Sequence, residues 1–201
     1  MNKNTKIVVI GGLVAVVLAL TVAYAILQQN LTINTAATVA AETWDVKFQS
    51  TSGDCTVTAN ANNTAHPATG TWTADNTSGT KSATVNVSLN LPGDSVTCDI
   101  PIANGGTINA VLTSFNAGTD AYAYTSATGS VTAADKALVS STVSYLNSSK
   151  TVVPSPVNSS LAAGTGVAYV RVVYTYPTEK TALPTNEMTV SRTISLTYQQ
   201  A

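Results

Sequence analysis

Charge is the scarcest feature of this 201-residue chain, because Asp, Glu, Lys and Arg together supply only 9% of it. A typical soluble domain has about a quarter of its residues charged. The few bases are scattered, so no basic cluster could neutralise phosphates, and this excludes nucleic acid as a partner. Thr, Ser, Asn and Ala fill the polar positions instead, a composition typical of a β protein in a wall or matrix.

Histidine is nearly absent as well. The single His66 lies in a polar stretch before Pro67 and is predicted to be a surface loop residue. The chain has no His-Glu-x-x-His motif, no Gly-x-Ser-x-Gly elbow and no Gly-x-Gly-x-x-Gly loop. We therefore expect no metal, no cofactor and no catalytic residue. A serine hydrolase built on His66 remains a minor alternative, because serines are plentiful.

Only two cysteines are present, Cys55 and Cys98. In an exported chain the default expectation is a disulfide between them, with free thiols as a lesser alternative. A zinc site is the least favoured reading, because two cysteines and one histidine are too few ligands. Three acids nearby, Asp54, Asp94 and Asp99, are interpreted as turn residues at strand ends rather than as a calcium site, which needs six to eight oxygens.

The N-terminus carries the longest apolar run. Lys3 and Lys6 precede an uncharged stretch from Ile7 to Ala25 that ends in Ala-Tyr-Ala. This pattern predicts a signal peptide over residues 1–25, cleaved between Ala25 and Ile26. The run is also long enough to remain as a membrane anchor, and that alternative stays open. In either case the signal segment is the expected contact with the membrane.

A strand is predicted directly after the signal, over residues 26–39. From Asn30 onward apolar and polar residues alternate, so one face of the strand is available for burial. The apolar positions of that face are Leu31, Ile33, Ala37 and Val39.

Residues 40–201 are predicted to form one all-β domain, a jelly-roll-like two-sheet β-sandwich; an immunoglobulin-like sandwich is the second choice. Alternating, β-branched segments recur every dozen or so residues between Gly, Pro and Asn turns. One short helix is expected at Ala133–Ala137. The expected strands are Thr43–Gln49, Cys55–Ala59, Thr69–Ala74, Ala83–Leu89, Ser95–Ile102, Ile108–Phe115, Val139–Leu146, Val167–Tyr176 and Met188–Gln199.

The same alternation predicts the positions of individual side chains. In Val167–Tyr176 the even-numbered residues are predicted to face the core, with Arg171 solvated on the other face. Trp44 and Trp72 are expected in the core. A polar loop over residues 117–130 is expected to present Tyr122 and Tyr124 to a partner or glycan. Asn-x-Ser/Thr sequons, which matter only in a host that glycosylates asparagine, occur at Asn30, Asn62, Asn76, Asn86, Asn147 and Asn158.

A central stretch carries a family resemblance. A strand runs into Leu91-Pro92-Gly93-Asp94, a second strand ends in Asn104-Gly105-Gly106, and a third begins Thr107-Ile108-Asn109-Ala110. With the long signal and the strand after it, this resembles the TasA/camelysin family of secreted biofilm-fibre proteins, and also archaeal bundling pilins. Two features depart from that pattern: the expected disulfide, and a shorter, less charged chain. The metallopeptidase label sometimes given to the family is not carried over, since the ligands are missing.

The resemblance implies a secreted structural subunit of the extracellular matrix or cell surface, which is not an enzyme. Its partner would be another copy of itself in a head-to-tail homopolymer, with signal peptidase acting first. In the family's fibres the N-terminal strand of one subunit enters a groove in the next, so residues 26–39 would be the donor strand. The alternative is a monomeric adhesin or glycan-binding sandwich. A secreted enzyme ranks last, for want of a catalytic set.

Overall fold

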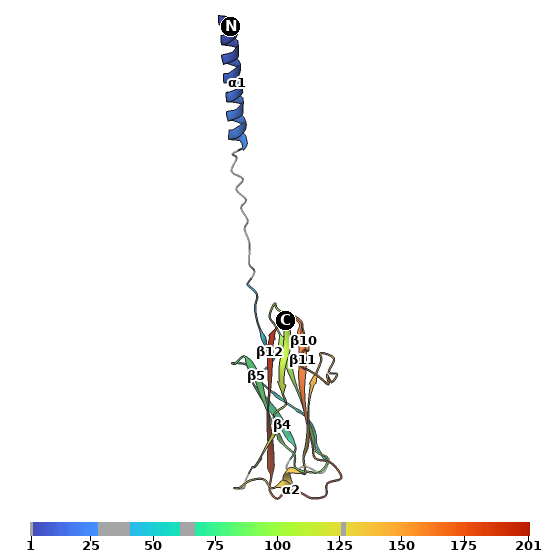
Figure 1. Ribbon diagram of the computed structural model, residues 1–201. Helices are drawn as coiled ribbons and strands as arrows, with labels where there is room; N and C mark the ends of the chain where they lie inside the picture. The colour runs from blue at the N-terminus through green and yellow to red at the C-terminus, as the bar shows by residue number, and fades with distance from the viewer. Residues whose placement is uncertain (1, 28–40, 61–66, 126–127) are drawn as a thin grey trace. The chain divides into compact units, whose positions relative to one another are not determined.

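The computed structural model describes residues 2–27, 41–60, 67–125 and 128–201 of the chain (Figure 1). The chain divides into two units, residues 1–40 and residues 41–201. The first unit contains the helix α1, Lys3–Leu27. None of the helices in the described ranges is long and apolar enough to cross a membrane.

Helix α1 includes the predicted cleavage site between Ala25 and Ile26 and continues to Leu27. The first two residues of the predicted donor strand are therefore helical in the uncleaved chain, and not extended. The strand's four apolar positions, Leu31, Ile33, Ala37 and Val39, lie outside the described residues.

The second unit is a β-sandwich built from two antiparallel sheets, as the alternation predicted. Figure 1 shows the long strands β11 and β12, which belong to different sheets, and the short helix α2 at the end of the sandwich away from the C-terminus. Its elements are β1 (Val46–Phe48), β2 (Ser52–Asp54), β3 (Thr56–Thr58), β4 (Thr69–Asp75), β5 (Thr80–Ser88), β6 (Ser95–Asn104), β7 (Ala110–Asn116), β8 (Asp120–Tyr124), α2 (Ala133–Lys136), β9 (Ser140–Leu146), β10 (Ser160–Leu161), β11 (Gly166–Thr175) and β12 (Met188–Gln200).

The five-stranded sheet has the order β1-β6-β11-β9, with β3 also paired to β6. The seven-stranded sheet has the order β10-β7-β12-β5-β4-β2, with β8 also paired to β12. From β5 onward the chain passes from one sheet to the other at nearly every connection; only β7 and β8 follow each other in the same sheet. These crossings join the sheets into a jelly-roll-like sandwich.

The core lies between the sheets and comes from one face of each strand. β6 and β11 alternate between buried and half-buried side chains along their whole length, as expected for strands with one face inward. In β11 the predicted inward face, which includes Val170, Val172 and Tyr174, is fully buried, and Tyr176 just beyond it is buried too. Trp72 is also buried, as predicted.

Three expectations about the fold were wrong. Trp44 is 40% exposed and lies two residues before β1, outside the strand. The turn expected at Ser52–Asp54 is the strand β2, which pairs with β4. The loop expected over residues 117–130 contains β8, which pairs with β12 over Met188–Arg192. β2 and β8 have only three and five residues, too few for alternation to reveal a strand, and pairing with a long neighbour decides their structure.

Gly118 allows β7 and β8 to follow one another along the same side of β12. It adopts φ +68°, and a Cβ at this position would lie 2.0 Å from the carbonyl oxygen of Thr193 in β12. Only glycine permits this close approach together with a left-handed backbone. As a result β7 and β8 form one long interrupted edge of the seven-stranded sheet.

Candidate functional site

The acids singled out in the sequence, all of them among the described residues, do not gather into one site. Within the described parts of the chain no group of three or more His, Cys, Asp or Glu residues could hold a metal ion. His66 lies outside the described residues. Asp54 ends β2, whereas Asp94 and Asp99 occupy separate hydrogen-bonded positions.

Asp94 explains the Leu91–Asp94 motif as a structural turn. Its carboxylate accepts hydrogen bonds from the backbone N–H groups of Asn60, Asn90 and Leu91, at 2.7, 2.9 and 2.9 Å. The Asp94 N–H closes the turn onto the Leu91 carbonyl at 3.0 Å, and Gly93 takes φ +97°. A Pro-Gly pair favours this kind of turn, because proline fixes φ at the first central position and glycine accepts a positive φ at the second, as in type II turns. The buried carboxylate organises the loop.

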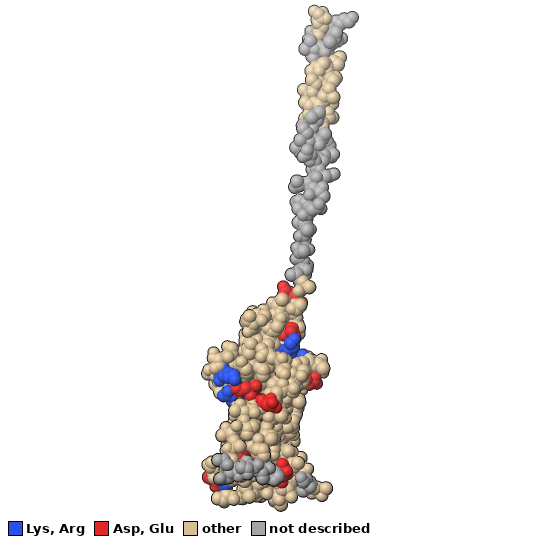
Figure 2. All heavy atoms as spheres, turned by 180° about the vertical axis from the view of Figure 1, so that it is seen from behind, with Lys and Arg blue, Asp and Glu red and all other residues tan. Residues whose placement is uncertain are grey.

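Asp99 is not the turn residue predicted, because it lies within β6. It accepts hydrogen bonds from Arg171 Nε at 2.6 Å and from Lys150 Nζ at 2.8 Å. The Arg171 guanidinium, assisted by Lys150 and opposed by partial burial, lowers the pKa of Asp99 to about 2. Arg171 is therefore an ion-pair partner on the outer face of the sheet. In Figure 2, charged side chains gather in a few clusters, and most of the visible surface is uncharged.

One side of the sandwich is closed by residues 45–58, which we call the crossing segment. Its strand β1 pairs with β6, β2 pairs with β4 of the other sheet, and β3 returns to β6. The predicted disulfide is present: Cys55 in this segment is bonded to Cys98 in β6. Along most of their length the outer edges of β4 and β6 therefore already have backbone partners.

The opposite side, which we call the open side, is formed by the outer edges of β7, β8 and β9. The first two residues of β7 pair with the two-residue strand β10 on this side. Across the described residues, Ser114–Asn116 of β7 (just after the bulge at Thr113), all of β8 and Ser140–Ser144 of β9 pair with one neighbouring strand only. An edge with free N–H and C=O groups is a template on which another strand can add.

Alternation in the antiparallel ladders shows which backbone groups face outward. The Thr125 N–H donates to the Glu187 carbonyl, in register with the β8–β12 ladder, so the backbone groups of Tyr122 and Tyr124 point away from β12. On β9 the Tyr145 carbonyl accepts from Val153, outside the sheet, so the backbone groups of Val143 point outward as well.

Asp120 ties the two edges of the open side together. It begins β8, and its carboxylate accepts hydrogen bonds from Arg192 Nε, the Tyr174 hydroxyl and the Ser141 hydroxyl, each at 2.7 Å. These partners come from β12, β11 and β9, so this single carboxylate links both sheets. The side chains of Asp120 and Arg192 are only 12% and 13% exposed.

The electrostatics of this cluster keep Asp120 ionised. Burial raises the pKa of Asp120, but hydrogen bonds from Arg192, Ser141 and Tyr174 outweigh burial and hold the pKa below its usual value. Burial and the Asp120 carboxylate together raise the pKa of Tyr174. At neutral pH Asp120 is therefore ionised and Tyr174 keeps its proton. This arrangement suits a structural hydrogen bond rather than proton transfer.

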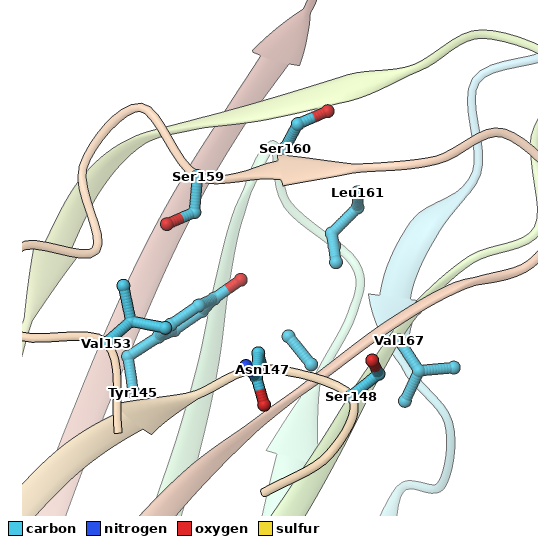
Figure 3. A pocket seen from close by; sticks show the side chains of 9 residues that line it. Tyr145, Asn147, Ser148, Val153, Ser159, Ser160, Leu161 and Val167 are labelled. Atoms are coloured by element: carbon cyan, nitrogen blue, oxygen red, sulfur yellow. The ribbon is translucent and has the colours of Figure 1, made fainter. Parts of the chain in front are cut away.

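A hollow of about 150 Å³ lies beside the open side, between β9, β10 and β11 (Figure 3). Tyr145, Leu161 and Val167 contribute apolar surface, and the rim is polar. The Phe115 ring meets the Tyr145 ring edge-on at 6.1 Å, and the Tyr145 and Tyr198 hydroxyls lie 3.2 Å apart. The polar rim residues are Asn147, Ser148, Ser159 and Ser160.

The two tyrosines predicted as exposed partner contacts have a different role. Tyr122 and Tyr124 are only half-exposed and pack against the core. The Tyr124 hydroxyl donates to Asp135 of α2 at 2.5 Å. Hydrogen bonds from Tyr124, then from Thr132 and Thr185, lower the pKa of Asp135 despite its burial. Asp120 and Asp135 were both missed, because single acids in polar stretches give no signal of the partners that the fold brings to them.

Comparisons of the chain with protein-family models, with curated proteins and with solved structures found no match. The site is therefore interpreted from its own geometry.

Proposed function

We propose that this chain is a secreted structural subunit of an extracellular filament or biofilm matrix fibre. Residues 26–39 of one copy would add as a strand to the open side of the next. The proposal draws on the resemblance to the TasA/camelysin family and on one structural observation. Among the described residues, the crossing segment closes one side of the sandwich, and the strand edges on the other side have no backbone partner.

The dimensions of the two elements agree. Fourteen extended residues span roughly 45 Å, at about 3.3 Å per residue. The interrupted edge from Thr113 to Tyr124 has nearly the same number of residues. Backbone hydrogen bonds would supply affinity, and Leu31, Ile33, Ala37 and Val39 would turn toward the gap between the sheets. Because donor and acceptor are different surfaces, the contact does not close on itself and gives a filament.

Export would control when this strand becomes available. In the uncleaved chain α1 includes Ala25, Ile26 and Leu27, so the start of the donor segment is helical. Cleavage by signal peptidase after Ala25 would separate it from the apolar part of α1. The mature protein would be secreted, located in the matrix or on the cell surface, and without cofactor or catalytic activity.

Deleting residues 26–38 tests the donor role. We expect the secreted intact chain to form filaments visible by negative-stain electron microscopy and the deleted chain to remain a monomer, because only the donor segment is lost. Circular dichroism of the deleted chain should retain the β-sheet signal, since the 41–201 unit holds the whole sandwich. Filaments that persist without the segment would refute the donor role.

The same experiment separates the alternative, a monomeric adhesin or glycan-binding sandwich. An intact chain that stays monomeric at high concentration, measured by light scattering, would favour that alternative. The half-buried positions of Tyr122 and Tyr124 remove the aromatic contacts first expected to support it.

A further inference from the structure

The connection between β9 and β10 has an Asn-x-Ser sequon at each end. The first is Asn147-Ser148-Ser149 and the second is Asn158-Ser159-Ser160. Residues of both line the hollow described above, and Figure 3 shows Ser159 and Ser160 on one side of it and Asn147 and Ser148 on the other. A sequon has chemical meaning only where the asparagine amide is accessible in a surface segment. The structure distinguishes the sequons on that criterion.

Asn158 meets the criterion. Its residue is exposed and adopts φ +74°, which asparagine tolerates better than most residues. Its backbone N–H donates to the Leu112 carbonyl at 2.8 Å, so the loop is anchored at this point. Among the described residues its side-chain amide has no hydrogen-bond partner. The amide nitrogen is thus free to react while the backbone stays in place.

Ser160, the hydroxyl residue of the same sequon, is equally accessible. It is exposed, and its hydroxyl makes no hydrogen bond within the described part of the chain. Its strand β10 is two residues long and lies at the edge of the sheet. A transferase that binds Asn158 and Ser160 together would need to displace no more than this short edge strand.

The other described sequons are less available. The Asn76 amide is fully engaged with the backbone of Phe48, accepting from its N–H at 2.9 Å and donating to its carbonyl at 3.1 Å. Asn86 is exposed, but it lies in the middle of β5, which is paired on both sides, so a transferase could not draw its backbone out without breaking two ladders. The Asn147 amide oxygen accepts from the N–H groups of Ser149 and Thr151, both at 3.0 Å, which fixes the orientation of that amide.

The surroundings of Asn158 indicate what a modification would do. The adjacent Val157 is 45% exposed, and Val152 on the same connection is 55% exposed. With few charged residues in the chain, this apolar surface beside a sheet edge favours nonspecific association. A hydrated sugar chain beginning at Asn158 would shield Val157 and the hollow, and would leave the β8 edge free.

We propose that Asn158 is a modification site that carries an N-linked glycan. The donor would be an oligosaccharide linked through phosphate to a membrane lipid. A bond forms between Asn158 Nδ2 and the anomeric carbon of the first sugar, and the bond from that carbon to the lipid phosphate oxygen breaks. The nitrogen loses one proton to a base of the transferase, and the lipid phosphate leaves. This inference stands whether or not the chain polymerises.

Tryptic peptide mass spectrometry of the chain purified from the cells that naturally produce it tests the proposal. Cleavage after Lys136, Lys150 and Arg171 places Asn147 in peptide 137–150 and Asn158 in peptide 151–171, so the two sites are read separately. We expect peptide 151–171 to carry a glycan mass that fragments into sugar units. A folded protein whose peptide 151–171 has only its polypeptide mass, or whose glycan is on 137–150 alone, overturns the assignment.

Two serine variants supply a matched comparison. Ser160→Ala removes the sequon hydroxyl and should abolish the added mass. Ser159→Ala changes only the middle position of the sequon, where any residue except proline is accepted, and should retain the mass. Asn158→Gly keeps a residue that accepts positive φ and should also lose the glycan. Circular dichroism confirms that each variant is folded. Retention of the mass in Ser160→Ala, or its loss in Ser159→Ala alone, contradicts the proposal.

Discussion

Replacing Cys55 and Cys98 together with alanine should lower the free energy of unfolding by about 4 kcal/mol. The disulfide closes a loop between residues 43 apart in sequence, and that closure restricts the unfolded chain. The loss should be largest for the crossing segment, because the disulfide joins it to β6. Urea denaturation of the double variant and the parent, followed by fluorescence of the buried Trp72, measures the difference.

Reducing the disulfide in the unsubstituted chain provides the control, because it removes the same cross-link and keeps both sulfur atoms. The two losses should agree closely. As the crossing segment loosens, the edges of β4 and β6 become available, so both samples should also aggregate more readily than the parent. A loss below about 1 kcal/mol in both would show that the disulfide does not hold this side closed.

Replacing Asp120 with alanine should lower the free energy of unfolding by about 3 kcal/mol or more, because it leaves the Arg192 guanidinium nearly buried without its anion. The hydroxyls of Tyr174 and Ser141 lose the same acceptor. These partners span both sheets, so we expect the edges of β8 and β9 to separate. Urea denaturation gives the energy, and hydrogen exchange should show faster exchange in β8 and β9.

Asp45 is the matched control for that substitution. It forms the same kind of ion pair, with Lys47 at 2.8 Å, but the two side chains are 41% and 50% exposed. Solvent screens such a pair, so Asp45→Ala should cost no more than about 1 kcal/mol. Equal losses for the two substitutions would mean that the Asp120 cluster does not join the sheets.

Strong alternation made the architecture predictable from the sequence. β6 and β11 have apolar residues at nearly every second position, and β12 does so except at Arg192; the inward face of β11 was predicted without coordinates. The short helix α2 was also expected, and it begins where Thr132 caps it. These elements are long or locally determined, so the sequence of each segment largely decides its own structure.

The closed and open sides depend on pairing between distant segments and were not predictable. Nothing in Ser52-Gly53-Asp54 indicates that it crosses to β4, and Trp44 gives no sign that its position lies outside the core. Asp120 has partners 21 to 72 residues away in the chain. Such contacts are set by the topology, which alternation in one segment does not encode.

Disulfide cross-linking between subunits tests the central claim most directly, that the donor segment of one copy binds the open side of another. A cysteine at Asn34, on the polar face of the donor segment, is combined with a second one on an exposed position: Ala121 on β8 or Thr142 on β9 for the open side, and Thr73 on β4 for the closed side. After mild oxidation of the secreted chain, denaturing gels should show ladders of covalent multimers for an open-side cysteine and none for Thr73→Cys. Ladders of equal strength from Thr73→Cys, or filaments with no open-side cross-link, would contradict the account.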